Sequence, residues 1–227
     1  GLFAAPATAA SAAVPVDGLS EATAAASCWE IKQNNADAPS GVYWLLTPAL
    51  GAPEQFYCDQ TTSGGGWVLV GRGREGWSTS NEGMGTPADV RNVVTGPEAF
   101  APRQLSSDVI DALLNNQGVS SLSEGIRLRR ATNQTGTTWQ EVTFTFSSPR
   151  ADWSWMFDNE QRINRWNIGT RTGTGGQTTS FGTGTALERV QTVTGSAQGW
   201  MDGFGFGTSS RGSTSARSYI WEASSTA

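Results

Sequence analysis

The side chains best suited to hold a metal ion are rich in oxygen and lie in the second half of the chain. They cluster at Asp152, Asp158, Asn159 and Glu160, and a further carboxylate, Asp202, stands among glycines. Calcium ions take about six to eight oxygen ligands from carboxylates, amides and backbone carbonyls. The sequence therefore makes these five residues candidate calcium ligands, with solvated surface acids and a turn aspartate as the alternative.

A second group of side chains could form an exposed aromatic platform. Trp77, Trp200 and Phe206 lie among glycines and small polar residues, where a large ring is not committed to a core. An exposed ring offers a broad apolar face on which a sugar ring can stack. These three are the candidate ligand-binding residues, whereas the tryptophans in strand-like stretches are expected to be buried, namely Trp29, Trp44, Trp67, Trp153 and Trp155.

The sequence contains few of the residue combinations that catalysis requires. The chain has no histidine, which excludes Ser-His-Asp and Cys-His nucleophiles and every zinc site that uses an imidazole. A glycosidase needs only two carboxylates, but no pair among the 20 acidic residues stands out by its motif. Residues 71–76 match G-x-G-x-x-G, yet no helix start follows to bind a phosphate. We predict a protein that is not an enzyme and has no catalytic residues.

The charge balance limits the partners. The net charge is −5 and the isoelectric point is about 4.8, so no overall positive field attracts nucleic acid or anionic lipid. Arg127, Arg129 and Arg130 form a small basic cluster that is expected to lie on the surface. No apolar run approaches the roughly 20 residues of a membrane-spanning helix. Partners are therefore expected to be neither nucleic acid nor lipid.

The two cysteines, Cys28 and Cys58, are the only ones in the chain. They form either one disulfide in an oxidising compartment or two unpaired buried thiols in a cytosolic protein. A bond between them would contribute about 3–4 kcal/mol by constraining the unfolded chain. The N-terminus lacks the basic head of a signal peptide, so Gly1 is expected to begin a mature form or a fragment.

The elements that must position these residues are mostly short strands. From Cys28 onward the pattern is strand-like, and one helix is expected over residues 105–117, with Ser106 or Ser107 as its cap and Gly118 at its end. Residues 169–184, rich in glycine and threonine, are expected to form a long surface loop. The expected strands cover residues 41–46, 55–58, 67–70, 126–129, 142–146, 152–158 and 218–222.

The domain organisation follows from a change in composition. Residues 1–27 are rich in alanine, with prolines that break a helical stripe, and are expected to form a linker or tether. Residues 28–227 form the expected domain, in which strands and one helix follow one another in an α+β pattern. Three consecutive glycines, Gly64–Gly66, are expected where φ is positive or a Cβ atom would clash.

One segment of the chain resembles a known family. Cys28, Ser40–Tyr43, Phe56–Asp59 and Gly64–Trp67 follow one another as in the N-terminal subdomain of fibrinogen-like domains. The resemblance covers about fifty residues, approximately 28–77. It implies a Cys28–Cys58 disulfide and an α+β fold, in which a small disulfide-closed sheet subdomain precedes a larger, loop-rich mixed part. It also implies a secreted or surface-displayed recognition module.

The C-terminal run Asp202–Gly207 is similar to the intelectin branch, in which a calcium ion between aromatic walls binds the vicinal diols of sugars. The resemblance implies a carbohydrate-recognition module, with calcium as its cofactor and glycans or other extracellular ligands as partners. The chain departs from the family in lacking the D-x-D calcium loop, a second cysteine pair and the histidine of the intelectin site. These departures favour the alternative, a structural or adhesive protein-interaction module that has lost the sugar site and acts as a homo-oligomer or in a surface assembly.

Overall fold

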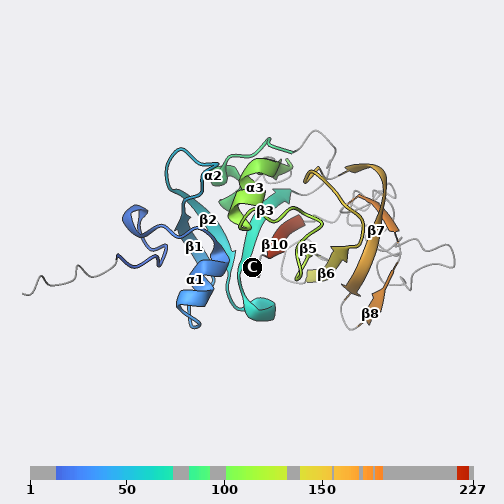
Figure 1. The fold of residues 1–227 in the computed structure, drawn as a ribbon, viewed down its shortest axis with the longest axis horizontal. Coiled ribbons are helices and arrows are strands. Elements are labelled where there is room, and N and C mark those ends of the chain that lie inside the picture. The colour runs from blue at the N-terminus through green and yellow to red at the C-terminus, as the bar shows by residue number, and fades with distance from the viewer. Residues whose placement is uncertain are drawn as a thin grey trace, which may run out of the picture.

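The chain forms an antiparallel sheet with short helices packed against its N-terminal half. The computed structural model describes residues 14–73, 82–92, 101–131, 139–154, 156–168, 171–175, 177–180 and 219–224. Ten strands are hydrogen-bonded in the order β1-β2-β3-β10-β5-β6-β7-β8, with β4 paired to β3 and β9 paired to β7. Figure 1 shows β6–β8 at the far end of the sheet from β1. The predicted α+β class is confirmed.

Every pairing between named strands is antiparallel. The last strand lies in the middle of the sheet, because β10 pairs with β3 on one side and with β5 on the other. It therefore joins the signature subdomain to the C-terminal part. The strands are β1 (Gly41–Leu45), β2 (Glu54–Asp59), β3 (Trp67–Gly73), β4 (Arg103–Gln104), β5 (Ile126–Ala131), β6 (Trp139–Phe146), β7 (Met156–Ile168), β8 (Arg171–Thr174), β9 (Gln177–Ser180) and β10 (Tyr219–Ser224).

The described helices are short. α1 and α2 both contact β3, and α2 also contacts β2. No described helix is long and apolar enough to cross a membrane. The helices are α1 (Cys28–Asn34), α2 (Pro87–Arg91) and α3 (Ser107–Leu113), with 3₁₀ turns η1 (Glu21–Thr23) and η2 (Thr62–Gly64).

The strand-like pattern expected from Cys28 is wrong, since α1 begins there. Ser27 caps the helix, with its Oγ accepting a hydrogen bond of 3.0 Å from the Glu30 N–H. Glu30 Oε2 reaches back and accepts one of 2.6 Å from the Ala26 N–H. Cys28 and Ile31, three residues apart, lie on the buried face of the helix. The capping hydrogen bonds and the one buried face therefore stabilise a helix at this position.

The helix expected over residues 105–117 is present but shorter. α3 begins after Ser106, whose Oγ accepts a hydrogen bond from the Val109 N–H at 3.4 Å. It ends at Leu113, because Asn115 and Asn116 take φ values of +58° and +59°. Left-handed asparagines terminate a helix as glycine does, so the end comes several residues before Gly118.

Two expectations about the C-terminal part are wrong in their bounds. The strand expected over residues 152–158 starts only at Met156, because Asp152 forms a turn in which its Oδ1 accepts from the Ser154 N–H at 3.2 Å. The surface loop expected over residues 169–184 contains β8 and β9, which pair with opposite ends of the long strand β7. Residues 181–184 lie outside the described part.

The segment before α1 is tied to the sheet from Gly18 onward. Trp44 N–H donates to the Gly18 carbonyl at 2.7 Å, and Ala25 N–H donates to the Trp44 carbonyl at 3.1 Å. Ala25 is buried. The described part of the expected tether therefore runs along the outer edge of β1. Residues 1–13 lie outside the described part, so the domain boundary at residue 27 stays a prediction.

The signature subdomain is fixed by its disulfide and its glycines. Cys28 on α1 and Cys58 on β2 are bonded and buried, which confirms the predicted pair. Gly64, Gly65 and Gly66 have φ values of +88°, +77° and +80°. A Cβ atom on Gly66 would lie 2.5 Å from Trp29 Cε3. The three glycines therefore occupy positions that L side chains rarely adopt, as expected.

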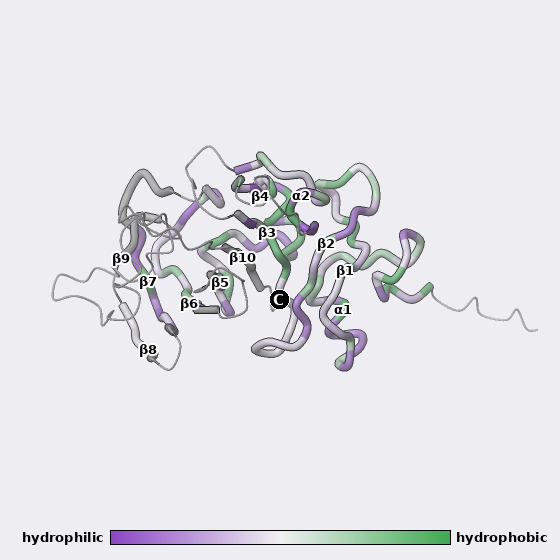
Figure 2. Tube along the Cα trace, turned by 180° about the vertical axis from the view of Figure 1, so that it is seen from behind, coloured by the Kyte–Doolittle hydropathy of each residue, from purple (hydrophilic) through white to green (hydrophobic). Residues whose placement is uncertain are grey.

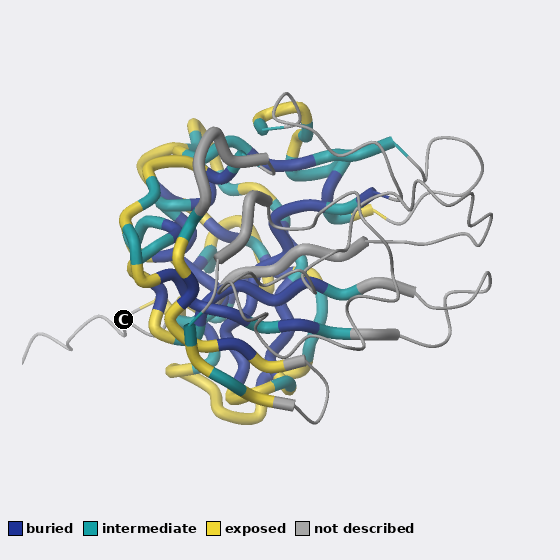
Figure 3. The backbone as a smooth tube through the Cα atoms, turned by 90° about the vertical axis from the view of Figure 1, so that its right-hand side faces the viewer, coloured by how far each residue is buried: buried dark blue, intermediate teal, exposed yellow. Residues whose placement is uncertain are grey.

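A single hydrophobic core extends from α1 through the middle of the sheet to β7. Figure 2 shows the apolar stretch along β3, and Figure 3 shows the buried backbone in the middle of the molecule with exposed segments around it. Trp67 and Trp153 are both buried, at 1% and 0% exposure, as expected. Trp29 and Trp44 are only half-buried, against expectation, and Trp155 lies outside the described part. The core thus covers one face of β5–β7 and leaves the other face for polar side chains.

Candidate binding site

A buried ion pair joins the signature subdomain to the C-terminal part of the sheet. Arg127 Nη2 on β5 lies 2.6 Å from Asp59 Oδ2 at the end of β2, and the two side chains are 1% and 10% exposed. The Arg127 guanidinium also lies over the Trp67 ring, 4.7 Å from its centroid. Arg127 was expected on the surface, and this expectation is wrong because Asp59 and Trp67 cover it.

Asp59 is held ionised by its hydrogen bonds. Burial by itself raises the pKa of this carboxyl, but hydrogen bonds from the Thr62 N–H, Arg127 and the Thr61 N–H lower it further than burial raises it. The two N–H groups donate to Oδ1 at 3.0 Å each. The pKa of Asp59 therefore lies well below its usual value, and the pair with Arg127 stays charged at neutral pH.

From Arg127 a row of polar side chains runs across β6, β7 and β8. Arg127 is directly opposite Thr143, Thr143 is opposite Asn167, and Asn167 is opposite Thr172. Residues directly opposite each other on neighbouring strands point to the same face of the sheet. The side chains of these four residues thus share one face, while Phe144 and its neighbour across the ladder, Ile126, face the core.

A second polar row lies beside the first. Thr145 is opposite Arg165, and Arg165 is opposite Thr174. Thr145 is only 7% exposed, and its Oγ1 has no hydrogen-bond partner among the described residues. A buried hydroxyl without a partner is uncommon in a folded protein. This hydroxyl is enclosed by the protein and is not open to the cavity.

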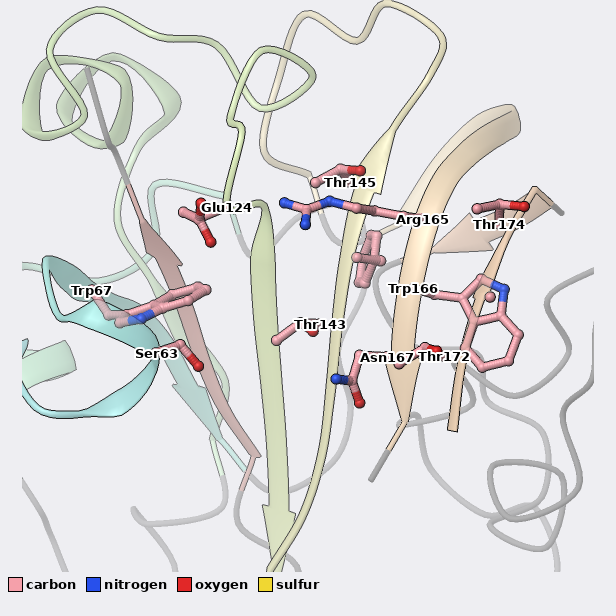
Figure 4. A pocket seen from close by; sticks show the side chains of 12 residues that line it. Ser63, Trp67, Glu124, Thr143, Thr145, Arg165, Trp166, Asn167, Thr172 and Thr174 are labelled. Carbon is pink, nitrogen blue, oxygen red and sulfur yellow. The ribbon is translucent and has the colours of Figure 1, made fainter. Parts of the chain in front are cut away.

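The two rows, apart from the buried Arg127, form the floor of an open cavity of about 440 Å³. Figure 4 shows Trp67 and Ser63 at one side of this cavity, Thr172 and Thr174 at the other, and Thr143 between them. The volume falls within the range of small-ligand sites, about 300–1,000 Å³. The lining residues are Ser63, Trp67, Glu124, Thr143, Phe144, Thr145, Arg165, Trp166, Asn167, Thr172, Gly173 and Thr174.

Two opposite charges line the cavity. Glu124 is half-buried and Arg165 is exposed, and Figure 4 shows the Arg165 guanidinium directed toward the side on which Glu124 lies. Arg165 Nη2 donates to the backbone carbonyl of Ser123. The ion pairs found among the described residues do not join Glu124 to Arg165. The cavity can therefore offer both a cation and an anion to a ligand.

Asp152 is the one candidate calcium ligand whose side chain is described, and it is engaged elsewhere. Its Oδ1 lies 2.7 Å from Arg150 Nη2 and also accepts from the Ser154 N–H. The described residues contain no group of three acidic, histidine or cysteine side chains that could hold a metal ion. Asp152 as a calcium ligand therefore stays a prediction. The side chains of Asp158, Asn159 and Glu160 on β7, and all of Asp202, lie outside that part.

The three candidate aromatic residues also lie outside the described part of the chain, namely Trp77, Trp200 and Phe206. The structure instead brings together threonines and an asparagine that sequence reasoning passed over. For Thr143 and Thr145 the signal was visible as the polar positions in the alternating run Val142–Phe146. Alternation shows that these side chains leave the core, but it does not show which neighbours they meet.

Comparison with known proteins gives a short sequence match. No family model matches the chain. Angiopoietin-4 of Bos taurus is 35% identical over 68 residues, which cover 27% of this chain and 14% of that protein. The chain thus spans only about a seventh of the length of this relative. The match supports the fibrinogen-like resemblance carried by the signature residues.

Three solved structures are similar at low identity. The fibrinogen-like globe domain of human ANGPTL6 gives a TM-score of 0.39 at 14% identity over 88% of this chain and 94% of that one. The corresponding domain of human ANGPTL2 gives 0.32 at 17% identity over 64% and 60%. Lamprey fibrin D-dimer, complexed with the peptide Gly-His-Arg-Pro-amide, gives 0.33 at 16% identity over 66% and 41%.

Proposed function

We propose that the chain is a non-enzymatic, extracellular protein-interaction module that binds its partner through the cavity on β6–β8. The observation that carries the proposal is the cavity itself, which has a floor of polar side chains and two opposite charges that do not pair with each other. Protein interfaces use polar groups of this kind to fix register and orientation. The match to angiopoietin-4 supports an interaction module rather than an enzyme.

The cavity is poorly equipped for catalysis. Glu124 is the only carboxylate among its described lining residues, whereas a glycosidase places two carboxyl groups on either side of the scissile bond. The chain contains no histidine to act as a general base. Threonine hydroxyls without an adjacent base are hydrogen-bonding groups rather than nucleophiles. These points favour binding over turnover.

The disulfide supports an extracellular location for the chain. The buried Cys28–Cys58 bond lies in the hydrophobic core and not at an exposed redox site. Stable structural disulfides are formed in oxidising compartments and are rare in the cytosol. We therefore place the chain outside the cell, secreted or displayed at a surface.

Carbohydrate recognition is the second candidate function. The hydroxyls of Thr143, Thr172 and Thr174 and the amide of Asn167 can all donate and accept hydrogen bonds, as sugar hydroxyls require. A calcium-dependent form would use the predicted ligands, namely Asp152, Asp158, Asn159, Glu160 and Asp202. Carbohydrate recognition and protein interaction would thus use the same cavity and differ only in the class of partner.

Binding arrays distinguish the two. The purified chain with its disulfide intact would be applied to an array of extracellular proteins and to a glycan array, each in calcium and in EDTA. Asn167→Leu removes an exposed amide from the cavity floor, and Gln33→Leu removes an exposed amide from α1 as the control. We expect protein spots that Asn167→Leu weakens and Gln33→Leu does not.

The other outcomes of the arrays are equally informative. Glycan spots alone with the same variant pattern would replace protein binding by carbohydrate recognition, and their loss in EDTA would establish calcium dependence. Binding that both variants leave unchanged would contradict a role for the cavity. Silence on both arrays would overturn the proposed function.

A further inference from the structure

We infer that the cavity on β6–β8 binds a polypeptide segment that carries a basic and an acidic side chain next to each other. Glu124 would bind the cation and Arg165 the carboxylate. The inference rests on the proposed function and deepens it, because it names the chemistry of the partner segment. It is carried by the placement of the two charges and by the polar floor between the cavity walls.

The two charges are positioned but not neutralised by each other. Arg165 lies near the C-terminal end of β7, and its Nη2 is anchored by the Ser123 carbonyl, which fixes the side chain at the cavity edge. Glu124 follows Ser123 directly in the chain and precedes β5. Glu124 and Arg165 do not form an ion pair with each other among the described residues. A ligand that brings one charge of each sign would satisfy both groups.

The requirement for two unlike charges favours a peptide over a sugar. Neighbouring lysine and aspartate side chains present an ammonium and a carboxylate within one short segment, whereas most saccharides carry neither. Arg165 can bind a carboxylate through parallel N–H donors, and Glu124 can accept from an ammonium group.

The floor supplies the groups that would hold the backbone of such a segment. Thr143 and Asn167 lie directly opposite each other on β6 and β7. A peptide offers an N–H or a carbonyl at every residue, so it can bond to these two side chains as well as pair with the two charges.

Titration calorimetry with blocked peptides tests the inference. The full chain would be titrated with acetyl-Gly-Lys-Asp-Gly-amide and its Asp-Lys isomer, and with forms in which glutamine replaces lysine, asparagine replaces aspartate, or both. We expect one isomer with both charges to bind at least about tenfold more tightly than its singly charged forms. Raising the salt concentration should weaken this preference, because exposed charges are screened.

Variants assign each charge. Glu124→Gln should abolish the advantage of lysine over glutamine, and Arg165→Gln should abolish that of aspartate over asparagine. Glu54→Gln and Arg162→Gln, at exposed charges outside the cavity lining, should change neither. Equal affinity for all the peptides, or no binding of any, would overturn the inference. If the protein array still shows partners weakened by Asn167→Leu, the proposed function survives that result, and if the array is also silent both fall.

Discussion

Arg127 on β5 and Asp59 on β2 are 68 residues apart in the chain, yet their charged atoms lie 2.6 Å from each other in the interior. β10 and β3 lie between their two strands in the sheet, so the pair spans the junction of the signature subdomain with the C-terminal part. A buried charge is tolerated only when it is paired and hydrogen-bonded. The junction therefore depends on both residues being present.

We expect Asp59→Ala to destabilise the fold by about 3–5 kcal/mol, because it leaves the Arg127 guanidinium buried without its carboxylate. Arg127→Met keeps an apolar contact with Trp67, and the double variant should cost less than the sum of the two single variants. The measurement is urea unfolding followed by tryptophan fluorescence. Glu141→Gln breaks the half-exposed pair with Arg129 and is the control, with an expected cost below about 1 kcal/mol. Single costs that add to within about 0.5 kcal/mol would show that the two residues are not coupled.

The same pair predicts how stability changes with pH. Because the folded-state pKa of Asp59 lies below the unfolded value of about 3.9, the stabilisation is complete above about pH 4 and is lost as the pH falls further. The free energy of unfolding of the wild type should therefore exceed that of Asp59→Asn most at neutral pH. The difference should shrink between about pH 4 and pH 2.5. If the difference in free energy of unfolding stayed constant down to about pH 2.5, the lowered pKa of Asp59 would be wrong.

The disulfide prediction concerns the unfolded state. Cys28→Ser opens a loop closed by residues 30 apart, which should lower the free energy of unfolding by about 3–4 kcal/mol. The midpoint of thermal unfolding in non-reducing buffer is the measurement. Cys58→Ser should have a similar effect, and reduction of the wild type should approach both. An unchanged midpoint in Cys28→Ser would show that the bond contributes no stability.

The signature subdomain was largely predictable from sequence, because its signals are local. Gly64–Gly66 and the two cysteines mark conformations and contacts that few other residues can provide. The helix α1 was missed although its signal was also local, since Ser27 and Glu30 stand at the spacing of a capping box. Trp29 and Ile31, which favour strands, led to the prediction of a strand instead.

The cavity could not be predicted, because it depends on strand register. Thr143 and Asn167 are far apart in the chain, and only the pairing of β6 with β7 places them side by side. The burial of Arg127 has the same origin, because Asp59 and Trp67 reach it from strands that precede it by about sixty residues. Alternation in sequence shows that a side chain leaves the core, but long-range pairing decides whether it meets solvent or a partner.

Replacing a glycine of the signature can destabilise the fold in two ways, by backbone strain and by a steric clash. Gly64 and Gly66 both have positive φ, but a Cβ atom at Gly64 would meet open space, whereas one at Gly66 would lie 2.5 Å from Trp29 Cε3 and 3.3 Å from its Cα. Gly64→Ala should therefore cost about 1 kcal/mol from left-handed backbone strain alone. Gly66→Ala should cost that amount plus about 1–3 kcal/mol for the forced displacement of Trp29. Urea unfolding of both variants measures the difference, and Gly51→Ala, where a Cβ atom meets open space without a positive φ, should be close to neutral. Equal costs for Gly64→Ala and Gly66→Ala would show that Trp29 moves aside freely and that the close approach of α1 to the glycine turn is not tightly packed.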